Sequence, residues 1–446
     1  MAISQFIEKI RNAGLDPIVE NAFLYYFKQV EEGASGKLSK NEIDAPAESN
    51  VINYDEIELS KPAPIDKLAV IKLNGGLGTS MGLSQAKTLL KVKDNLNFLD
   101  IIARQILTLR DQTQHDIPLI FMHSFNTQKD SLEYLEKYKD LKLENIPLDF
   151  LQNKFPKVRQ SDLAPFIHKD DAKTWNPPGH GEIYMALAIT GTLDKLLAAG
   201  KEYAFLSNSD NLGSVVDDKI LGYFAENNLP FLMEVCTRTE MDKKGGHLAQ
   251  THDGQLILRE TAQCPEDEKD LFEDVHYYKY FNTNNLWINL KILKEELDKN
   301  GNFLPLSLII NPKEVDGIKV FQLESAMGAA ISVFKNSKAM VVHRDRFAPV
   351  KKTDDLFVVR SDAFKLSSNY HLKLATGKQP IVRLDQKYFK MVNEFETRFL
   401  ADVPSLKDCE KFVLKGDVKF GKNVIIKGNV EYVTEEPVIL ENCVLE

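Results

Sequence analysis

The stretch from residue 73 to residue 87 has the composition of a phosphate-binding loop. Four glycines within eight residues remove the Cβ atoms that would keep the backbone from curling around a ligand. Residues 74–86 carry no charge, and Lys87 follows them. Free backbone N–H groups closed by one ammonium suit a polyphosphate, because oriented amides attract anions and the lysine adds a point charge. A glycine-rich turn without a ligand is the alternative.

Two common phosphate-loop patterns do not match this stretch. The dinucleotide pattern G-x-G-x-x-G would need glycine at position 81, where the chain has Met81. The P-loop pattern needs Gly-Lys-Ser/Thr, whereas here Lys87 follows Ala86. Residues 88–92 also have the pattern of an extended segment, whereas both motifs lead into a helix. A P-loop kinase is therefore disfavoured.

Two polar loops carry candidate groups for a substrate and a metal. His180 lies between two glycines after two prolines, just before a predicted helix, where an anion or a hydroxyl oxygen is favoured. A histidine on the surface is the alternative. Asp210 follows a predicted strand, and Mg²⁺ takes one or two carboxylates together with phosphate oxygens and water. An Asx turn that caps the next helix is the alternative for Asp210.

Two further segments could bind charged or hydroxylated groups. Lys351 and Lys352 precede a predicted helix whose N-terminus attracts anions, with a solvated charged turn as the alternative. The amides of Asn282, Asn284 and Asn285 could bind sugar hydroxyls or cap the following helix. No Ser/His/Asp or Cys/His pattern indicates a covalent nucleophile. The chemistry therefore points to phosphoryl or nucleotidyl transfer by positioning, cations and metal.

Short apolar runs alternate with helical patterns through most of the chain, which predicts an α/β fold with a mainly parallel sheet covered on both faces. Ligands in such sheets bind beyond the carboxyl ends of the strands, where the glycine stretch and Asp210 both occur. Strands are predicted at 68–73, 118–122, 148–151, 203–206, 231–235, 320–323 and 339–342, with a hairpin at 246–260. Helices are predicted at 98–109, 128–138, 182–197, 215–226, 353–365 and 386–400.

The two ends of the chain differ from this pattern. The apolar spacing of residues 1–30 predicts one or two helices. The polar composition of residues 31–66 predicts an irregular linker. Two related stretches, 414–418 and 426–430, lie twelve residues apart and predict rungs of a β-helix-like domain, with a plain meander as the alternative. We therefore predict three domains: N-terminal helices and linker at 1–66, a catalytic domain at 67–385, and a C-terminal helix and β-helix domain at 386–446.

The composition is that of a soluble globular enzyme, with 43% hydrophobic and 27% charged residues among 446. A net charge of −9 without a long basic run disfavours nucleic acids and anionic membranes as partners. The four cysteines are scattered and have no metal-ligand spacing, so we expect reduced thiols in a cytoplasmic protein.

Taken together, these segments resemble the UTP–glucose-1-phosphate uridylyltransferase family, the UDP-glucose pyrophosphorylases. The resemblance rests on residues 73–82, 177–181, 208–213, 281–287, 322–324 and 346–351, in the family's order. It implies a nucleotidyltransferase fold related to glycosyltransferase A enzymes, with a small C-terminal left-handed β-helix domain. The implied reaction converts UTP and glucose 1-phosphate into UDP-glucose and pyrophosphate, with Mg²⁺ as cofactor.

The resemblance also implies roles for individual residues. The catalytic cations would be Lys87 and Lys351, although Lys352 beside Lys351 leaves the choice of the second lysine open. The nucleotide-binding residues would be Leu73, Asn74, Gly75, Gly76, Gly78 and Thr79, with Gln152 and Gly179 on the uracil. The sugar phosphate would be held by His180, Asn208, Glu260 and Asn284, and magnesium by Asp210.

Two alternatives remain beside this interpretation. A broader UDP-sugar or UDP-N-acetylhexosamine pyrophosphorylase is the nearest, although residues 79–82 differ from the Gly-Thr-Arg-Leu-Gly loop of the acetylhexosamine branch. A non-catalytic nucleotide-sugar sensor would bind UTP without releasing pyrophosphate, and the joint presence of Lys87, Asp210 and Lys351 argues against it. UTP and glucose 1-phosphate are thus the expected partners. A homo-oligomer through the C-terminal domain is left open.

Overall fold

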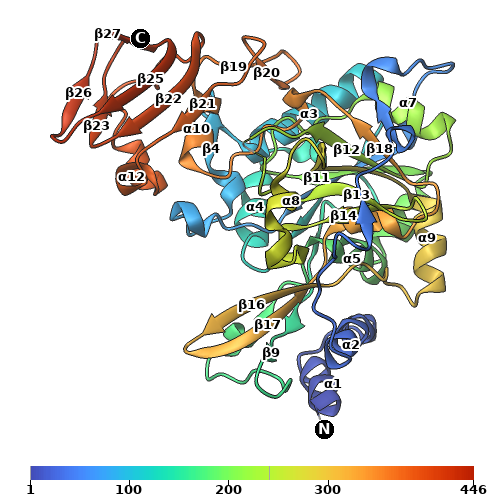
Figure 1. The fold of residues 1–446 in the computed structure, drawn as a ribbon. Helices are drawn as coiled ribbons and strands as arrows, with labels where there is room; N and C mark the ends of the chain where they lie inside the picture. The colour runs from blue at the N-terminus through green and yellow to red at the C-terminus, as the bar shows by residue number, and fades with distance from the viewer. Residues whose placement is uncertain (1, 241) are drawn as a thin grey trace.

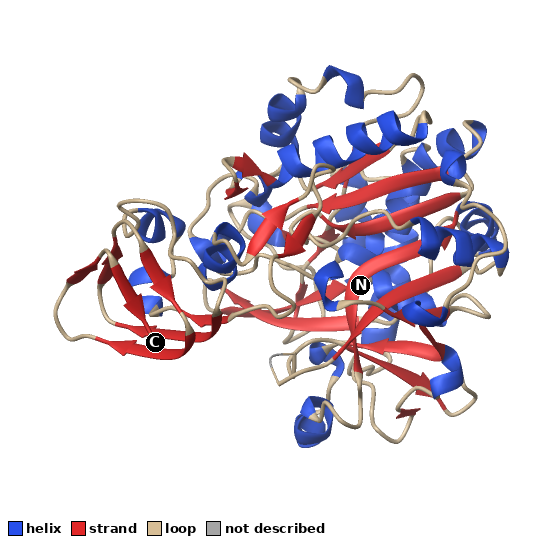
Figure 2. Cartoon of the chain, turned by 90° about the horizontal axis from the view of Figure 1, so that it is seen from above, coloured by secondary structure: helices blue, strands red, loops and turns tan. Residues whose placement is uncertain are grey.

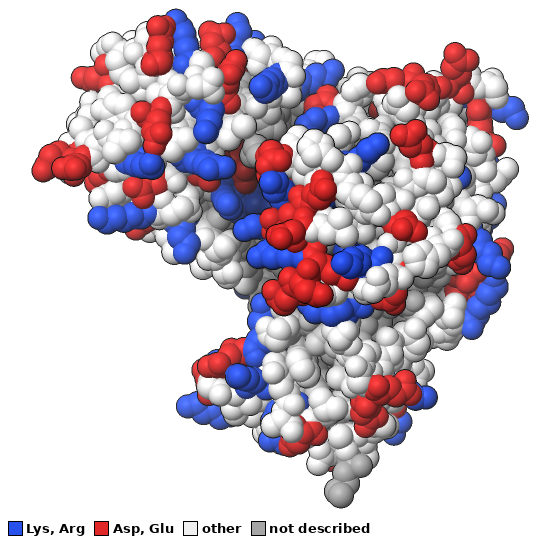
Figure 3. All heavy atoms as spheres, viewed as in Figure 1, with Lys and Arg blue, Asp and Glu red and all other residues white. Residues whose placement is uncertain are grey.

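The computed structural model describes residues 2–240 and 242–446. Figure 1 shows a central α/β body, a pair of N-terminal helices packed at one end, and a small lobe of strands at the C-terminus. None of the helices in the described residues is long and apolar enough to cross a membrane. On the face drawn in Figure 3, acidic and basic side chains are interspersed, and basic ones gather in the hollow between the C-terminal lobe and the body.

The central sheet has eleven strands, eight of them in the order β2-β18-β12-β15-β11-β3-β6-β7. The strands are β1 Ile43–Asp44, β2 Val51–Asn53, β3 Leu68–Asn74, β6 Leu119–His123, β7 Asp149–Leu151, β11 Tyr203–Asn208, β12 Phe231–Thr237, β13 His247–Thr251, β14 Leu256–Arg259, β15 Tyr280–Asn289 and β18 Lys338–Val341. Along the eight-strand path the pairs are parallel except those of β15, which is antiparallel to β11 and β12. The predicted α/β class is confirmed, and the sheet is mixed rather than parallel, since β15 is antiparallel to its neighbours and β1, β13 and β14 also pair antiparallel.

Helices cover both faces of this sheet (Figure 2). Successive strand residues point to opposite faces, so Ile71 and Leu206 pack in one core with the residues of α5, α6 and α9. Their neighbours Val70 and Phe205 pack in the other core, against α3 and α7. The helices are α1 Ala2–Asn12, α2 Pro17–Glu31, α3 Phe98–Thr113, α4 Gln128–Leu135, α5 Ile183–Ile189, α6 Thr192–Ala198, α7 Asp218–Glu226, α8 Lys269–Glu273, α9 Leu290–Lys299, α10 Thr353–Arg360, α11 Gln386–Phe389 and α12 Val392–Glu396.

Several predicted elements are wrong in continuity or type. The helix predicted at 182–197 is two helices, α5 and α6, separated at Gly191, which has φ +66°. The helix predicted at 386–400 is likewise divided into α11 and α12. The predicted linker at 31–66 contains β1 and β2, and β2 pairs with β18 at the edge of the sheet. Residues 88–92 are only partly extended, since a 3₁₀ turn at Lys87–Leu89 precedes β4 Lys91–Lys93.

The C-terminal lobe consists of two successive coils of strands. Its strands are β21 Ile381–Arg383, β22 Cys409–Lys415, β23 Val418–Phe420, β24 Val424–Ile426, β25 Gly428–Val433, β26 Val438–Leu440 and β27 Cys443–Leu445. Parallel pairing joins β22 to β25, β23 to β26 and β24 to β27. Phe412 pairs with Val430 and Val418 with Val438, so the coil repeat is longer than the twelve-residue repeat seen in the sequence.

Smaller strand pairs complete the fold. These strands are β5 Leu96–Asn97, β8 Phe155–Pro156, β9 Val158–Arg159, β10 Trp175–Asn176, β16 Ile309–Val315, β17 Ile318–Glu324, β19 Phe364–Leu366 and β20 Leu372–Leu374. The end of β17 matters most for the site, because Leu323 is buried with Phe23 of α2 and Phe155 of β8. This core fixes the segment that follows β17, which packs against the loop containing His180.

Candidate functional site

Four neighbouring parallel strands end at one edge of the sheet, and the predicted site residues follow them. The register pairs Asn208 of β11 with Leu73 of β3, and Asn74 of β3 with His123 of β6. Gln152 follows β7, and its N–H donates to the carbonyl oxygen of His123 at 2.8 Å. The glycine loop therefore lies between Gln152 and the loop after Asn208, at the edge where such sheets bind ligands.

A cavity of about 280 Å³ opens at this edge. Among the site residues predicted from the sequence, those that line this cavity are Leu73, Asn74, Gly75, Gly76, Lys87, Gln152, Gly179, His180, Asn208 and Asp210. It is also lined by Thr88, Met122, Pro177 and Ser209, which the sequence analysis did not select although Thr88 and Ser209 adjoin a predicted residue. The predicted residues Gly78, Thr79, Glu260, Asn284 and Lys351 do not line it.

The glycine loop borders this cavity at Gly75 and Gly76 and has backbone amides without an acceptor in the described part of the chain. The N–H groups of Gly76, Leu77 and Gly78 have no acceptor among the residues that the structure describes. Two carbonyl oxygens of the loop accept hydrogen bonds from other parts of the protein. The N–H of Lys87 donates to the carbonyl oxygen of Gly76 at 3.1 Å, and Ser124 Oγ donates to that of Gly75 at 2.9 Å. The loop is thus fixed through its acceptors while its donors stay open, which is the arrangement that an anion requires.

Asn74 holds the loop through a buried side chain. Its Oδ1 accepts from Thr88 Oγ1 at 2.9 Å, and its Nδ2 donates to Ser131 Oγ at 3.0 Å and to His123 Nδ1 at 3.2 Å. Burial lowers the pKa of His123 to about 4, so the ring is neutral and its Nδ1 can accept. Asn74 therefore borders the cavity while its side chain braces β3 against β6 and α4.

Lys87 and Asp210 form an ion pair in the cavity. Lys87 Nζ lies 2.7 Å from Asp210 Oδ2, with side chains 11% and 26% exposed. The Asx-turn alternative for Asp210 is wrong, because α7 begins at Asp218 and is capped by Asp217, whose side chain accepts from the N–H of Ile220. Asp210 thus directs a carboxylate to the glycine loop instead of to a helix.

His180 is a neutral hydrogen-bond donor in this site. The N–H of Met327 donates to His180 Nδ1 at 3.0 Å, so the proton of the neutral ring resides on Nε2. Burial lowers the pKa of His180 to about 4, which keeps the ring neutral. The loop itself is held closely, because a Cβ on Gly179 would lie 2.3 Å from the carbonyl oxygen of Ser325. Only glycine fits at position 179.

Gln152 has one end of its amide fixed. Its Nε2 donates to the carbonyl oxygen of Gly179 at 2.9 Å, which leaves Oε1 as an acceptor beside the glycine loop. The next residue, Asn153, donates its N–H and its Nδ2 to the buried carboxyl group of Glu182. Burial raises the pKa of Glu182 to about 7. Asn153 and Glu182 thus position Gln152, and the sequence analysis did not select either of them.

The remaining predicted residues come from the other half of the sheet. Asn284 lies in a bulge of β15 opposite the step from Glu234 to Val235. It has φ +59°, and its Oδ1 accepts from Asn282 Nδ2 at 2.8 Å. The alternative that one of the three amides caps the following helix is wrong, since Asn289 caps α9. Because β15 runs antiparallel, this bulge lies beside the carboxyl end of β12, at the same edge as the cavity.

Glu260 and Lys351 lie near one another. Burial raises the pKa of Glu260, and the charge of Lys351 lowers it in part. Lys351 is exposed, and its N–H and that of Lys352 both donate to Asp355 Oδ2, at 2.7 and 2.8 Å. The two lysines are therefore presented at the start of α10.

The residues present fit a magnesium ion shared with a bound triphosphate. Within residues 2–240 and 242–446, no group of three or more His, Cys, Asp and Glu side chains could enclose a metal by itself. Mg²⁺ often binds through one or two carboxylates, with phosphate oxygens and water as its other ligands. Asp210 supplies one such carboxylate beside open amides, and in the structure it already pairs with a cation, Lys87.

The whole chain is similar to proteins of known function. A family model described as UTP–glucose-1-phosphate uridylyltransferase matches residues 20–427. The relative of that name from Hordeum vulgare is 38% identical over 458 residues, covering 99% of this chain and 95% of the relative. The Solanum tuberosum relative is also 38% identical, covering 97% and 94%. The chain belongs to the UTP–glucose-1-phosphate uridylyltransferase family.

Solved structures agree with the assignment to the uridylyltransferase family. A structure described as UDP-glucose phosphorylase from Trypanosoma brucei has a TM-score of 0.90 and 40% identity, and the match covers 100% of this chain and 98% of that one. A mutant UDP-glucose pyrophosphorylase from Leishmania major, solved with UDP-glucose, has a TM-score of 0.91 and 38% identity, with coverage of 99% and 98%. The resemblance expected from the sequence is confirmed, and the P-loop kinase alternative is wrong.

Proposed function

We propose that this chain transfers the uridylyl group of UTP to glucose 1-phosphate and releases pyrophosphate. The observation that carries the proposal is the pairing of Lys87 with Asp210 beside an open glycine loop. A lone lysine or a lone carboxylate would have many explanations. Together in one cavity, in a chain similar along its length to uridylyltransferases, they support nucleotidyl transfer.

In this proposal the nucleotide occupies the cavity between β3 and β7. Gly75, Gly76, Gly78 and Thr79 hold the triphosphate through backbone groups, and Leu73 and Asn74 support them at the end of β3. Gln152 and Gly179 contact the uracil. The free Oε1 of Gln152 supports this role, since uracil carries a proton on N3 that an acceptor can bind, whereas cytosine does not.

The sugar phosphate binds across the cavity from the nucleotide. His180 donates from Nε2 to a substrate oxygen, and Asn208, Glu260 and Asn284 bind hydroxyl or phosphate oxygens. The neutral state of His180 supports this arrangement, because a fixed donor recognises an oxygen without adding a titrating charge.

The reaction is an in-line displacement. A phosphate oxygen of glucose 1-phosphate attacks the α-phosphorus of UTP, the bond from that phosphorus to the β-bridging oxygen breaks, and pyrophosphate leaves. Lys87 and Lys351 neutralise the negative charge that grows on the transferred group and on pyrophosphate. We propose Asp210 as the protein ligand of Mg²⁺, which when bound would add positive charge on the phosphate oxygens.

Several larger-scale assignments remain predictions. The parallel pairing of β22–β25, β23–β26 and β24–β27 supports a small β-helix at the C-terminus, and we propose the left-handed form. The division into 1–66, 67–385 and 386–446 and a cytoplasmic location are proposed on the sequence alone, and a homo-oligomer through the C-terminal lobe stays open.

A substrate panel tests the proposed function. Pyrophosphate release from UTP and Mg²⁺ is measured with glucose 1-phosphate, galactose 1-phosphate and N-acetylglucosamine 1-phosphate, and UTP binding is measured by calorimetry. We expect release with glucose 1-phosphate above the other two sugars. Equal release with several sugars would favour the broader pyrophosphorylase, and UTP binding without any release would favour the sensor.

A further inference from the structure

The segments that carry Asp210 and Lys351 are hydrogen-bonded to each other. The N–H of Val350 donates to the carbonyl oxygen of Asp210 at 3.1 Å, and the N–H of Leu212 donates to that of Ala348 at 3.2 Å. Asn211 and Pro349 form an antiparallel bridge between these bonds. The two segments are far apart along the chain, so their alignment has to be set by tertiary contacts.

Asn211 joins these segments through its side chain. Oδ1 accepts from the N–H of Gly213 at 3.1 Å and from the N–H of Ala348 at 2.8 Å. Nδ2 donates to the carbonyl oxygen of Arg346 at 3.2 Å and to Asn285 Oδ1 at 3.3 Å. The amide thus uses both of its donors and both of its acceptor sites, in a position that is 4% exposed.

The backbone of both segments packs closely at the same point. A Cβ on Gly213 would lie 2.3 Å from the carbonyl oxygen of Asp345, so no larger residue fits without moving one segment. The position of the Lys351 segment therefore depends on where residues 345 and 346 are anchored.

Arg346 is that anchor. Its Nε and Nη2 donate to the two carboxylate oxygens of Glu234 at 2.7 and 2.6 Å. Glu234 is fully buried in β12, and its oxygens also accept from Asn285 Nδ2 and Trp287 Nε1. Removing two charges from water costs free energy that a buried ion pair often fails to recover, so this pair is poorly explained by stability alone. A bidentate pair fixes geometry as well as distance.

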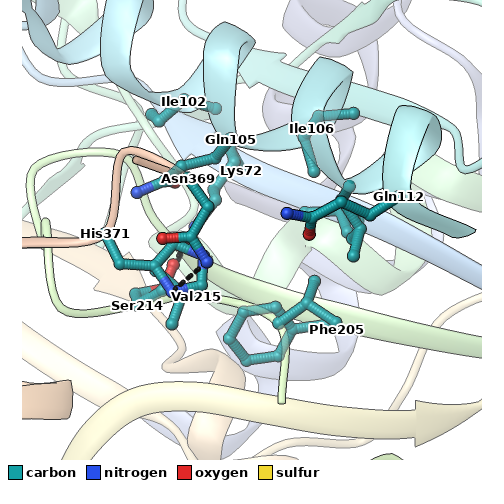
Figure 4. A pocket seen from close by; sticks show the side chains of 13 residues that line it. Lys72, Ile102, Gln105, Ile106, Gln112, Phe205, Ser214, Val215, Asn369 and His371 are labelled. Carbon is teal, nitrogen blue, oxygen red and sulfur yellow. Dashed lines mark hydrogen bonds between the residues drawn. The ribbon is translucent and has the colours of Figure 1, made fainter. Parts of the chain in front are cut away.

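The loop on the Asp210 side is held by Lys72 as well as by Arg346, whose Nη2 donates to the carbonyl oxygen of Val215 at 3.0 Å. Lys72 Nζ donates to Ser207 Oγ at 2.7 Å and to the carbonyl oxygen of Ser214 at 2.7 Å. These two bonds hold the loop at a residue before Asp210 and at a residue after it. Figure 4 shows Lys72, Ser214 and Val215 among the residues that line the pocket under α3. Because Lys72 belongs to β3, the Asp210 loop is fixed to the strand that leads into the glycine loop.

We propose that Arg346, seated on Glu234, is a positioning residue that holds Lys351 at a set distance from the Asp210 loop. It acts through its own carbonyl oxygen, bound by Asn211, and through the short stretch of backbone that leads to Lys351. The inference rests on the proposed function, in which Lys351 neutralises charge during transfer. Arg346 itself contacts no predicted substrate-binding residue other than through this backbone, among the residues that the structure describes.

The test compares Arg346→Lys with Arg344→Lys. Arg344 is the matched control, since it makes a bidentate pair with Asp242 at 3.0 Å for both bonds, two residues away in the same segment. We expect Arg346→Lys to lower kcat by about 10²-fold, the cost of misplacing a reacting group by about 1 Å, with the KM for UTP nearly unchanged. We expect the kcat of Arg344→Lys to stay within about threefold of the wild-type kcat.

A double-mutant cycle separates positioning from a structural role. If Arg346 acts through Lys351, then Arg346→Lys lowers kcat by less than about threefold in the Lys351→Ala background. The effects of coupled residues on kcat are not additive. A full loss of about 10²-fold in that background would overturn the inference, since it would show that Arg346 acts independently of Lys351.

Hydrogen exchange gives a readout that does not depend on activity. We expect faster exchange in peptides covering 347–352 and 209–214 of Arg346→Lys, and no change there in Arg344→Lys. Unchanged exchange in both peptides would overturn the inference even if the wild-type protein made no UDP-glucose, an outcome that would refute the proposed function separately. Should Arg346→Lys fail to fold, Asn211→Ala cuts the same link while leaving the Glu234 pair intact, and the same results are expected of it.

Discussion

Lys87 Nζ lies 2.7 Å from Asp210 Oδ2, so the two groups proposed to act on the triphosphate neutralise each other in the absence of substrate. Both side chains are partly shielded from water, which strengthens the attraction over that of an exposed pair. When UTP binds with Mg²⁺, each group would change its partner. Lys87 would pair with phosphate oxygens, and Asp210 would bind the metal. The resting pair thereby keeps each charge in place for the substrate complex.

Loss of the Lys87 ammonium should impair transfer. We expect Lys87→Ala to lower the rate of pyrophosphate release by about 10²–10³-fold, the usual cost of removing one group that stabilises developing charge. Lys91→Ala is the control, because Lys91 is exposed on β4. A Lys87→Ala protein that keeps more than a third of the wild-type rate would show that Lys87 is not a catalytic cation.

Removal of the Asp210 charge should change the magnesium dependence. We expect Asp210→Asn to raise the Mg²⁺ concentration for half-maximal rate by about tenfold or more, because a neutral amide is a weaker ligand for Mg²⁺ than a carboxylate. The measurement is a magnesium titration at saturating substrates, with Asp194→Asn on the exposed side of α6 as the control. An unchanged titration curve would remove Asp210 from the metal site.

The Gln152 amide should decide between pyrimidines. Truncation to Gln152→Ala should lower the preference for UTP over CTP by about tenfold to a hundredfold, the worth of one buried hydrogen bond. Gln160→Ala is the control, since Gln160 donates to the carbonyl oxygen of Val320 away from the cavity. If the ratio of kcat/KM for UTP and CTP stays at the wild-type value, another group recognises the base.

Acidification should destabilise the fold through buried histidines. Burial lowers the pKa of His123 from 6.5 to about 4, so between these values the unfolded chain binds a proton that the folded chain does not. The stabilising contribution is therefore complete above pH 6.5 and is lost as the pH falls toward about 4. One such group adds a slope of at most about 1.4 kcal/mol per pH unit.

His123→Asn tests this contribution, because asparagine keeps an acceptor for Asn74 and does not titrate. Urea unfolding between about pH 4 and pH 7 should give a shallower loss of unfolding free energy on acidification than in wild type. Glu182 works in the opposite direction, since burial raises its pKa to about 7 and its contribution is lost as the pH rises. The Glu182 contribution is present in both wild type and His123→Asn and therefore cancels in the comparison. Equal slopes of unfolding free energy against pH in the two proteins would contradict the prediction.

Much of the site could be predicted from local sequence. Strand patterns are short and apolar, and in an α/β sheet the residues that follow them meet at one edge. The order of strands and loops along the chain therefore suffices to place the glycine loop and Asp210 together, whereas Gln152 is indicated only by the family resemblance. The composition of the loop also indicates its ligand, because charge and glycine content are local properties.

The rest depends on contacts between distant segments. The bulge that presents Asn284 arises from its pairing with β12, and the link between Asn211 and Arg346 joins residues that the sequence does not associate. The division between α5 and α6 at Gly191 cannot be predicted from periodicity, because the apolar pattern continues across it. Likewise β2 carries too few residues to show a period, and only its pairing with β18 identifies it as part of the sheet.

The most direct test of uridylyl transfer follows the α-phosphorus of UTP. The wild-type protein is incubated with Mg²⁺, glucose 1-phosphate and UTP labelled with ³²P at the α-position, and labelled UDP-glucose and pyrophosphate are quantified together. We expect the label to appear in UDP-glucose in a one-to-one ratio with pyrophosphate, and Lys87→Ala to lose both products equally. Pyrophosphate without labelled UDP-glucose, or neither product although UTP binds, would contradict uridylyl transfer.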